Sequence, residues 1–106
     1  MKKETFGPVV TVSKFKSEDV DLSLANDTTY GLAAGIHTKD YERAIRVTNA
    51  LKACTTWVNM YNFVHWSIPL DGYKQSGLGR ECGEAVLENY LETKAVFFNM
   101  GLNAPQ

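Results

Sequence analysis

The order of the segments that favour strands and helices predicts an α/β fold for this chain of 106 residues. β-Branched and aromatic residues favour strands at residues 8–15, 32–37, 54–58 and 92–99. Apolar residues at helical spacing separate the second of these strands from the third. Strands that alternate with helices are typical of layered sheets with parallel pairing and right-handed crossovers. We therefore expect a single small α/β domain over residues 1–106, with strands and crossover helices in a three-layer-like arrangement.

The first strand and the first helix follow one another closely. The sequence PVVTVSKF supplies Val10, Val12 and Phe15 to the strand. Ser17 can then cap a helix, and the acidic residues after it lie in the first turn, where they favour the helix dipole. This helix is predicted to run to about Asn26, where the turn sequence NDTTYG begins.

The central segments predict a strand, a helix and a second strand. The apolar run LAAGIH is bounded by turn signals and therefore favours a buried strand. Thr38 can cap the next helix. One face of that helix is predicted to carry Tyr41, Ala44, Ile45, Thr48 and Leu51. The sequence CTTWV then predicts another strand.

The last third of the chain begins with a loop over residues 59–79, a length that usually indicates function or mobility. A third helix is predicted over residues 80–90, and ETKAVFFN forms the last strand before the tail GLNAPQ, which we expect to fray. A sheet built from so small a number of predicted strands leaves one edge and one apolar face open, unless another part of the protein or a partner covers them.

Composition and charge exclude several classes of protein. The net charge of −1 gives no basic footprint for nucleic acid, and no apolar run approaches the ~20 residues of a membrane span. No apolar signal-peptide stretch follows the first lysines, so we expect a cytoplasmic protein. Cys54 and Cys82 do not have the spacing of a metal site. They are predicted to be small buried hydrophobes, with a reactive thiol as the alternative.

Three sequence elements resemble the aldehyde dehydrogenase superfamily. They are ETFGPV, NDTTYGLAAG, and WVN followed by GYKQSGLGRE, and they occur in the family's order and spacing. The resemblance covers about residues 4–99 and is far more specific than a lone glycine motif. It implies the C-terminal part of the catalytic domain together with the oligomerisation strand. The step from His65 to Trp66 is similar to fungal-type members.

The resemblance also implies roles for particular residues. Glu4 looks like the carboxylate that accepts hydrogen bonds from the nicotinamide ribose, and Phe6 looks like the aromatic beside the nicotinamide. Glu81 resembles an acid of the family's active-site region that lies in the layer behind the residues that contact the substrate. Residues 61–70 correspond to one wall of the aldehyde pocket, and residues 93–98 resemble the strand that joins a neighbouring subunit, which favours a homodimer.

The family's chemistry needs parts that lie before Glu4 in its members. These are a cysteine nucleophile, donors for the oxyanion, a glutamate base and a dinucleotide domain. Neither Cys54 nor Cys82 stands at the nucleophile's place, and no G-x-G-x-x-G follows a strand. We therefore expect a truncated member without redox competence, in which Glu4 and Phe6 are vestigial and no cofactor is used.

The loop of residues 61–73 departs from the family pattern, because Leu70 and Asp71 replace phenylalanine and glycine. One hypothesis is a cofactor-independent isomerase or cyclase of biosynthesis that moves protons on a hydrophobic small molecule. Its candidate catalytic residues are His65, Asp71 and Glu81. Its candidate substrate-binding residues are Tyr61, Phe63, Trp66, Leu70 and Tyr73.

Two other hypotheses remain open. The chain could be a non-catalytic oligomerisation or regulatory module, whose strand ETKAVFFN pairs with a second copy or with a longer relative by strand addition. It could also be a piece of a dehydrogenase with no function of its own. His65 and Trp66 would then be inherited pocket residues rather than a new site.

Overall fold

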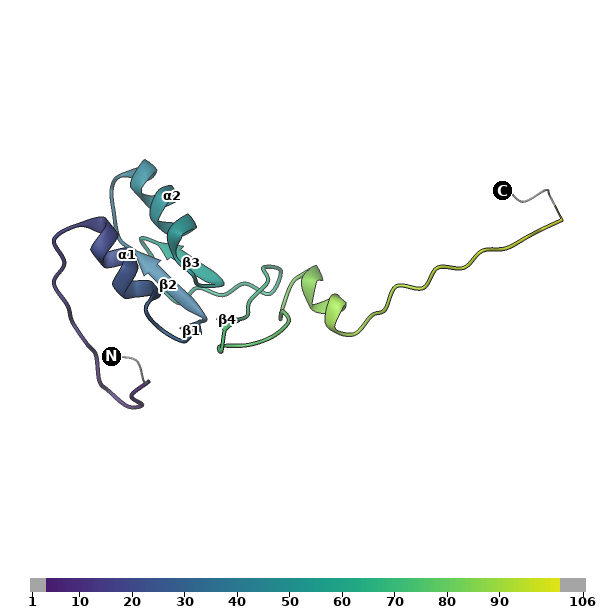
Figure 1. Ribbon diagram of the computed structural model, residues 1–106, viewed down its shortest axis with the longest axis horizontal. Coiled ribbons are helices and arrows are strands. Elements are labelled where there is room, and N and C mark those ends of the chain that lie inside the picture. The colour runs from purple at the N-terminus through teal and green to yellow at the C-terminus, as the bar shows by residue number, and fades with distance from the viewer. Residues whose placement is uncertain (1–3, 102–106) are drawn as a thin grey trace.

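The computed structural model describes residues 4–101, and the molecule is elongated (Figure 1). Its principal extents are 72 × 34 × 25 Å, and its Cα radius of gyration is 20.8 Å. A compact domain of this length has a radius of gyration of about 13 Å. The excess arises because residues 91–100, the C-terminal arm, leave the folded part as an extended chain.

A β–α–β unit forms the centre of the folded part. It consists of β2 (Ala33–Ile36), α2 (Tyr41–Ala50) and β3 (Thr55–Val58). The two strands pair in parallel along their whole length. This unit confirms the predicted α/β class and the predicted strand–helix–strand order in the middle of the chain.

Three hydrophobic side chains are buried among the described residues. Ala44 and Val47 lie on α2, and Trp57 lies on β3; they are 6%, 7% and 8% exposed. Val58 lines a cavity together with Ala44, so it lies on the α2 side of the sheet. Because neighbouring strand residues face opposite sides, Trp57 lies on the other face.

The loop after β3 covers that second face. The indole N–H of Trp57 donates a 2.8 Å hydrogen bond to the carbonyl of Phe63. The ring of Tyr61 meets the indole edge-on, with 5.0 Å between centroids. Gly35 pairs with Trp57 in the sheet, and a methyl group at Gly35 would lie 3.7 Å from the Tyr61 ring, an ordinary contact distance.

A second, smaller sheet joins two distant parts of the chain. β1 (Tyr30–Gly31) pairs antiparallel with β4 (Tyr73–Lys74), and the Gly31 N–H donates a 2.9 Å hydrogen bond to the Ser76 hydroxyl. A Cβ at Gly31 would lie 2.7 Å from the Lys52 carbonyl oxygen. Only glycine therefore lets these three segments approach one another.

Helix α1 (Glu18–Asn26) confirms the first predicted helix, but the predicted cap differs. Ser17 occupies the N-cap position with extended backbone, yet its side chain makes no capping hydrogen bond. The helix buries none of its side chains.

The two outer strands predicted over residues 8–15 and 92–99 do not form within the described residues. Both segments are extended and exposed, and neither is paired with another strand. The strand-type composition is real, but a strand also needs a partner for its N–H and C=O groups. The sequence predicts the propensity and not the partner.

The third predicted helix, over residues 80–90, is also wrong in type and length. The structure has a 3₁₀ helix, η1 (Glu84–Asn89). Cys82 and Gly83 have φ values of 59° and 58°, which a right-handed helix excludes. The helix can therefore begin only after Gly83.

Helix α2 lies where it was predicted, with a different cap and a different buried face. The Asp40 carboxylate, and not Thr38, caps the helix by accepting a 3.0 Å hydrogen bond from the Arg43 N–H. Of the predicted face, Ala44 is buried, whereas Tyr41 and Ile45 are 77% and 47% exposed. Val47, which the predicted face did not include, is the second buried residue of α2. The face of α2 that lies against the sheet is therefore centred on Ala44 and Val47.

Replacing Gly31 with alanine should destabilise the fold by about 1–3 kcal/mol, because the added methyl group overlaps backbone that cannot move independently. Gly35→Ala is the matched control, since the nearest atom to its added carbon is 3.7 Å away. Urea unfolding followed by tryptophan fluorescence, to which the buried Trp57 and the exposed Trp66 both contribute, would measure both variants. Equal losses of stability in the two variants would contradict the close approach at Gly31.

The cap of α2 should be sensitive to acid. The hydrogen bond from the Arg43 N–H, and next to it the charge of Arg43, hold the pKa of the Asp40 carboxyl below its usual range. A carboxyl whose pKa is lowered by folding stabilises α2 at neutral pH, and this contribution is lost as the pH falls through the lowered pKa. Circular dichroism should show less acid loss of helix in Asp40→Asn, which keeps an acceptor, than in the unaltered chain. An unchanged acid profile would contradict this role.

Candidate functional site

The loop of residues 61–73 folds back against the segment that follows it. Leu70 and Glu81 form an isolated antiparallel pair, with two reciprocal 2.8 Å backbone hydrogen bonds. The Gly83 N–H donates a 2.9 Å hydrogen bond to the carbonyl of Trp66. The structure therefore brings together three of the predicted site residues, although Glu81 itself is exposed.

His65 is hydrogen-bonded to Ser67, two residues along the chain. Its Nδ1 lies 2.8 Å from the Ser67 hydroxyl oxygen and accepts a 3.3 Å hydrogen bond from the Ser67 N–H. A backbone N–H can only donate, so Nδ1 carries a lone pair. A neutral ring with that lone pair carries its proton on Nε2 and can donate a hydrogen bond there. Such an N–H is too weakly acidic to act as a general acid, so this geometry suits a hydrogen-bond donor.

Asp71 is committed to the backbone of its own loop. Its Oδ1 accepts a 2.5 Å hydrogen bond from the Gly72 N–H. A Cβ at Gly77 would overlap the same oxygen, so the carboxylate fills the space that Gly77 leaves. Among the described residues, no hydrogen bond joins Asp71 to His65. The predicted pair is therefore not assembled as a hydrogen-bonded dyad.

Most of the predicted substrate-binding residues point to solvent. Tyr61, Phe63, Trp66 and Tyr73 are 72%, 57%, 78% and 43% exposed. Trp66 lies beside His65 with 5.4 Å between ring centroids and 30° between ring planes. These aromatic side chains do not close around a common cavity.

Arg80 contacts Tyr73 at the end of the loop. The guanidinium carbon lies 5.4 Å from the centroid of the Tyr73 ring. An attraction of this kind at an exposed site contributes about 0.5–1 kcal/mol. It joins Tyr73 on β4 to the segment that follows, a contact that the sequence pattern did not predict.

A cavity of about 640 Å³ lies between the loop and η1. It is lined by Trp66, Ser67, Pro69, Gly83, Glu84, Ala85 and Leu87. Its volume falls within the ~300–1,000 Å³ of small-molecule sites. Of the residues predicted from sequence, only Trp66 lines it.

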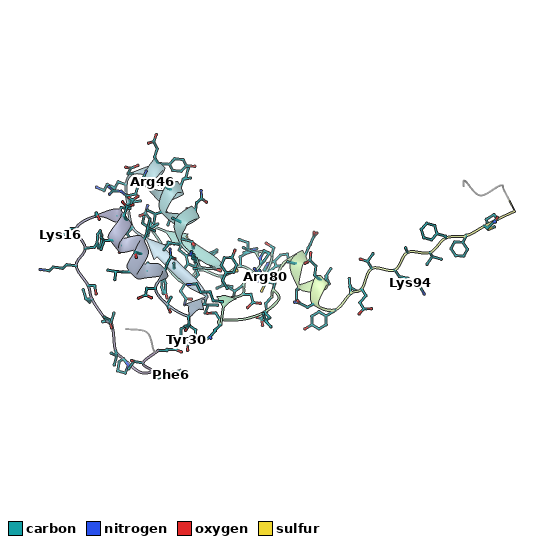
Figure 2. The ribbon with its side chains drawn as sticks, in the orientation of Figure 1. Phe6, Lys16, Tyr30, Arg46, Arg80 and Lys94 are labelled. Atoms are coloured by element: carbon teal, nitrogen blue, oxygen red, sulfur yellow. The ribbon has the colours of Figure 1, made fainter. Side chains whose placement is uncertain are left out.

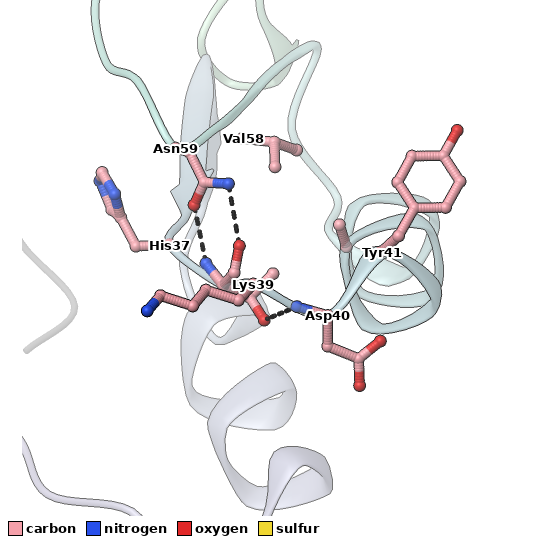
Figure 3. Close-up of a pocket in the computed structure, with 8 residues that line it drawn as sticks. His37, Lys39, Asp40, Tyr41, Val58 and Asn59 are labelled. Atoms are coloured by element: carbon pink, nitrogen blue, oxygen red, sulfur yellow. Dashed lines mark hydrogen bonds between the residues drawn. The ribbon is translucent and has the colours of Figure 1, made fainter.

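A second cavity, of about 780 Å³, lies at the carboxyl ends of β2 and β3 (Figure 3). Asn59 closes one side, because its amide accepts from the Thr38 N–H and donates to the Thr38 carbonyl, both at 2.8 Å. The side chains of His37, Asp40 and Tyr41 point in different directions and form no cluster (Figure 3). Strand ends of this kind often bind ligands in α/β folds, and that topology was the one signal in the sequence for this cavity.

Phe6, which Figure 2 labels, lies in the extended N-terminal segment, and Glu4 lies two residues before it in the chain. Phe6 is 86% exposed, and Glu4 is exposed as well. A nicotinamide ring needs an enclosed, ordered surface, which an exposed side chain on an extended segment does not supply. These two residues, as this chain arranges them, do not fit a dinucleotide.

Among residues 4–101, no three His, Cys, Asp or Glu side chains are grouped so that they could hold a metal ion. No helix there is long and apolar enough to cross a membrane. Cys54 and Cys82 are both free thiols and are half-buried rather than fully buried.

Residues 1–96 match the model of the aldehyde dehydrogenase family. An aldehyde dehydrogenase from Alternaria alternata is 54% identical over 100 residues, which are 94% of this chain and 20% of that protein. One from Aspergillus niger is 55% identical over 100 residues, with the same two coverages. The chain thus spans about a fifth of the length of these relatives.

Solved structures show the same similarity. The apo betaine aldehyde dehydrogenase from Staphylococcus aureus superposes with a TM-score of 0.90 at 46% identity, over 99% of this chain and 20% of that one. An aldehyde dehydrogenase from Bacillus cereus, solved as an NAD⁺ complex, also gives 0.90 at 47% identity, over 93% of this chain and 20% of that one. Even the extended parts of this chain therefore follow the path of a segment within a much larger protein.

Proposed function

Because the chain belongs to the aldehyde dehydrogenase family, we propose that it acts as a pairing module of that fold. One observation carries the proposal: the C-terminal arm leaves the folded part with its backbone and its aromatic side chains uncovered. Phe97 and Phe98 on the arm are 94% and 81% exposed. Exposed apolar surface of this kind marks a site of association.

The arm has the dimensions and the free groups that strand addition requires. Its ten residues span about 30 Å at ~3.3 Å per residue, which is longer than a typical strand. Residues 92–98 make no backbone hydrogen bond to another described segment. Their N–H and C=O groups are therefore available to a sheet edge, while side chains that alternate along the arm supply apolar contact.

We propose a second copy of this chain as the partner. Each copy offers an arm and also the open edges of the two-stranded β2–β3 sheet. Two copies related by a twofold axis can therefore exchange arms, and each arm then lies against the other copy's sheet. A longer member of the family would offer similar edges and is the competing partner.

Replacing Phe97 with serine should weaken the dimer by about tenfold in dissociation constant, because a buried aromatic side chain at an interface contributes more than ~1 kcal/mol. Tyr41→Ser is the matched control, since Tyr41 is an aromatic residue on α2 that is 77% exposed. Sedimentation velocity over a range of concentrations would measure both variants.

A monomer at every concentration would contradict the dimer. If that monomer bound a longer family member through the arm, the partner assignment would change while the pairing role would stand. Equal weakening by the two substitutions would show that association does not use the arm.

A second candidate function is a cofactor-independent isomerase or cyclase acting by proton transfer. The volume of the cavity of about 640 Å³ beside Trp66 and Ser67 is in the range of small-molecule sites and favours it, although none of His65, Asp71 and Glu81 lines that cavity. The hydrogen bonds of His65 leave its Nε2 as a hydrogen-bond donor, so the base would be Asp71 or Glu81. The commitment of Asp71 to Gly72 and the exposure of Glu81 rank this candidate second.

Ring opening of 5-nitrobenzisoxazole, which reports proton abstraction by a base in an apolar site, tests the second candidate. If the site works, Asp71→Asn or Glu81→Gln should lower the rate by about 10²-fold or more. His65→Ala should slow only reactions that need a donor, and Glu88→Gln, a nearby exposed acid on η1, should have no effect. A rate equal to that of buffer, or variants without effect, would contradict this candidate.

A further inference from the structure

We propose that α1 is a hinged strap that is fixed at Asn26, is released at Glu18, and opens and closes over a groove against α2 and β2. This inference goes beyond the pairing function and does not depend on it. It rests on how the two ends of the helix are attached and on what lies between them.

The C-terminal end of α1 is fixed by hydrogen bonds to distant parts of the chain. The Asn26 amide donates to the Ala50 carbonyl at 3.0 Å and accepts from the Lys52 N–H at 2.8 Å. The Lys74 ammonium donates to the carbonyls of Asn26 and Thr28 at 3.1 and 3.0 Å. These four bonds join the helix end to two separate segments, so this end is the hinge.

The N-terminal end is attached through the Glu18 carboxylate, by ion pairs and charge-assisted hydrogen bonds to α2. Glu18 accepts from the Nε and Nη2 of Arg46 at 2.7 and 3.0 Å, and the Nε of Arg43 lies 3.1 Å from its second oxygen (Figure 2 labels Arg46). The two arginine side chains are 54% and 55% exposed. Salt therefore screens this attachment, whereas it acts little on the neutral hydrogen bonds of the Asn26 amide at the hinge.

Packing holds the middle of the helix only in part. None of the side chains of α1 is buried, and Val20 and Leu24 are 48% and 55% exposed, while Leu22 is half-buried against the groove. A groove of about 570 Å³ lies beneath α1, and its apolar floor includes Ile36, Val47 and Leu51. The closed position of α1 therefore depends on the contacts at its two ends.

Release of the strap has a measurable consequence. An isolated helix of nine residues is not stable in water, so α1 should unfold when it leaves α2. Its amide hydrogens would then exchange with solvent, while those of α2 and β3 remain protected.

Hydrogen–deuterium exchange with mass spectrometry tests the strap. Glu18→Gln should raise the exchange rate of residues 18–26 by about two- to fivefold, the range of an exposed ion pair, and leave residues 41–50 unchanged. Asp19→Asn is the matched control, because it removes a first-turn charge from the same helix without an ion pair to α2. Adding 1 M NaCl should reproduce the effect in the unaltered chain and add little in Glu18→Gln.

Asn26→Ala separates the hinge from the release point. It should raise exchange in residues 18–26 at every salt concentration, because it removes the attachment that salt does not screen. Three results would overturn the strap: equal effects of Glu18→Gln and Asp19→Asn, loss of protection in α2 together with α1, or no protection of α2 in the unaltered chain.

Discussion

The parallel pairing of β2 with β3 is the interaction on which the rest of the folded part depends. It gives α2 a surface on one side and brings Trp57 under Tyr61 and Phe63 on the other. It also places the two strand ends together, where the Asn59 amide joins them by two hydrogen bonds to Thr38. Without this pair of strands, the loop before β4 and helix α2 would have no shared surface on which to pack.

That unit is too small to bury what the chain carries. Apolar residues make up 44% of the sequence, yet among the described residues three hydrophobic side chains are buried. The surplus lies on the N-terminal segment, on the loop after β3 and on the C-terminal arm. The chain nevertheless keeps the path of its family, with a TM-score of 0.90 to a protein of which it covers a fifth. Its exposed apolar segments therefore suit contact with surfaces outside the chain, which is the physical basis for the proposed pairing role.

The sequence predicted the parts of the fold that short stretches determine. The helix α2 and the strands β2 and β3 were found because their apolar spacing and their turn residues are local. The predictions of strands over residues 8–15 and 92–99 were wrong because a strand forms only when a second segment pairs with it, and the local sequence does not contain that second segment. The third helix failed because the positive φ at Cys82 gives no signal in a non-glycine residue.

The candidate site was predicted less well, for a related reason. The residue types indicated that Asp71 could orient His65 through a hydrogen bond. Such a bond depends on the direction of both side chains as well as on the distance between them. His65 instead bonds Ser67, two positions away, and this spacing was a signal that the sequence contained. The pairing of Leu70 with Glu81 depends on the loop as a whole, and no local pattern could have predicted it.

Asp71 illustrates how a loop can absorb a departure from its family pattern. The resemblance places glycine at this position, and a carboxylate there needs both room and a donor. Gly77 provides the room, because it has no Cβ at the place that Oδ1 occupies, and the Gly72 N–H provides the donor. The first role of Asp71 is therefore to hold the turn between residues 71 and 77. Because a carboxylate has two oxygens, Oδ2 could accept a proton from a substrate while Oδ1 keeps its hydrogen bond to the Gly72 N–H, so catalysis by Asp71 would not require the loop to rearrange.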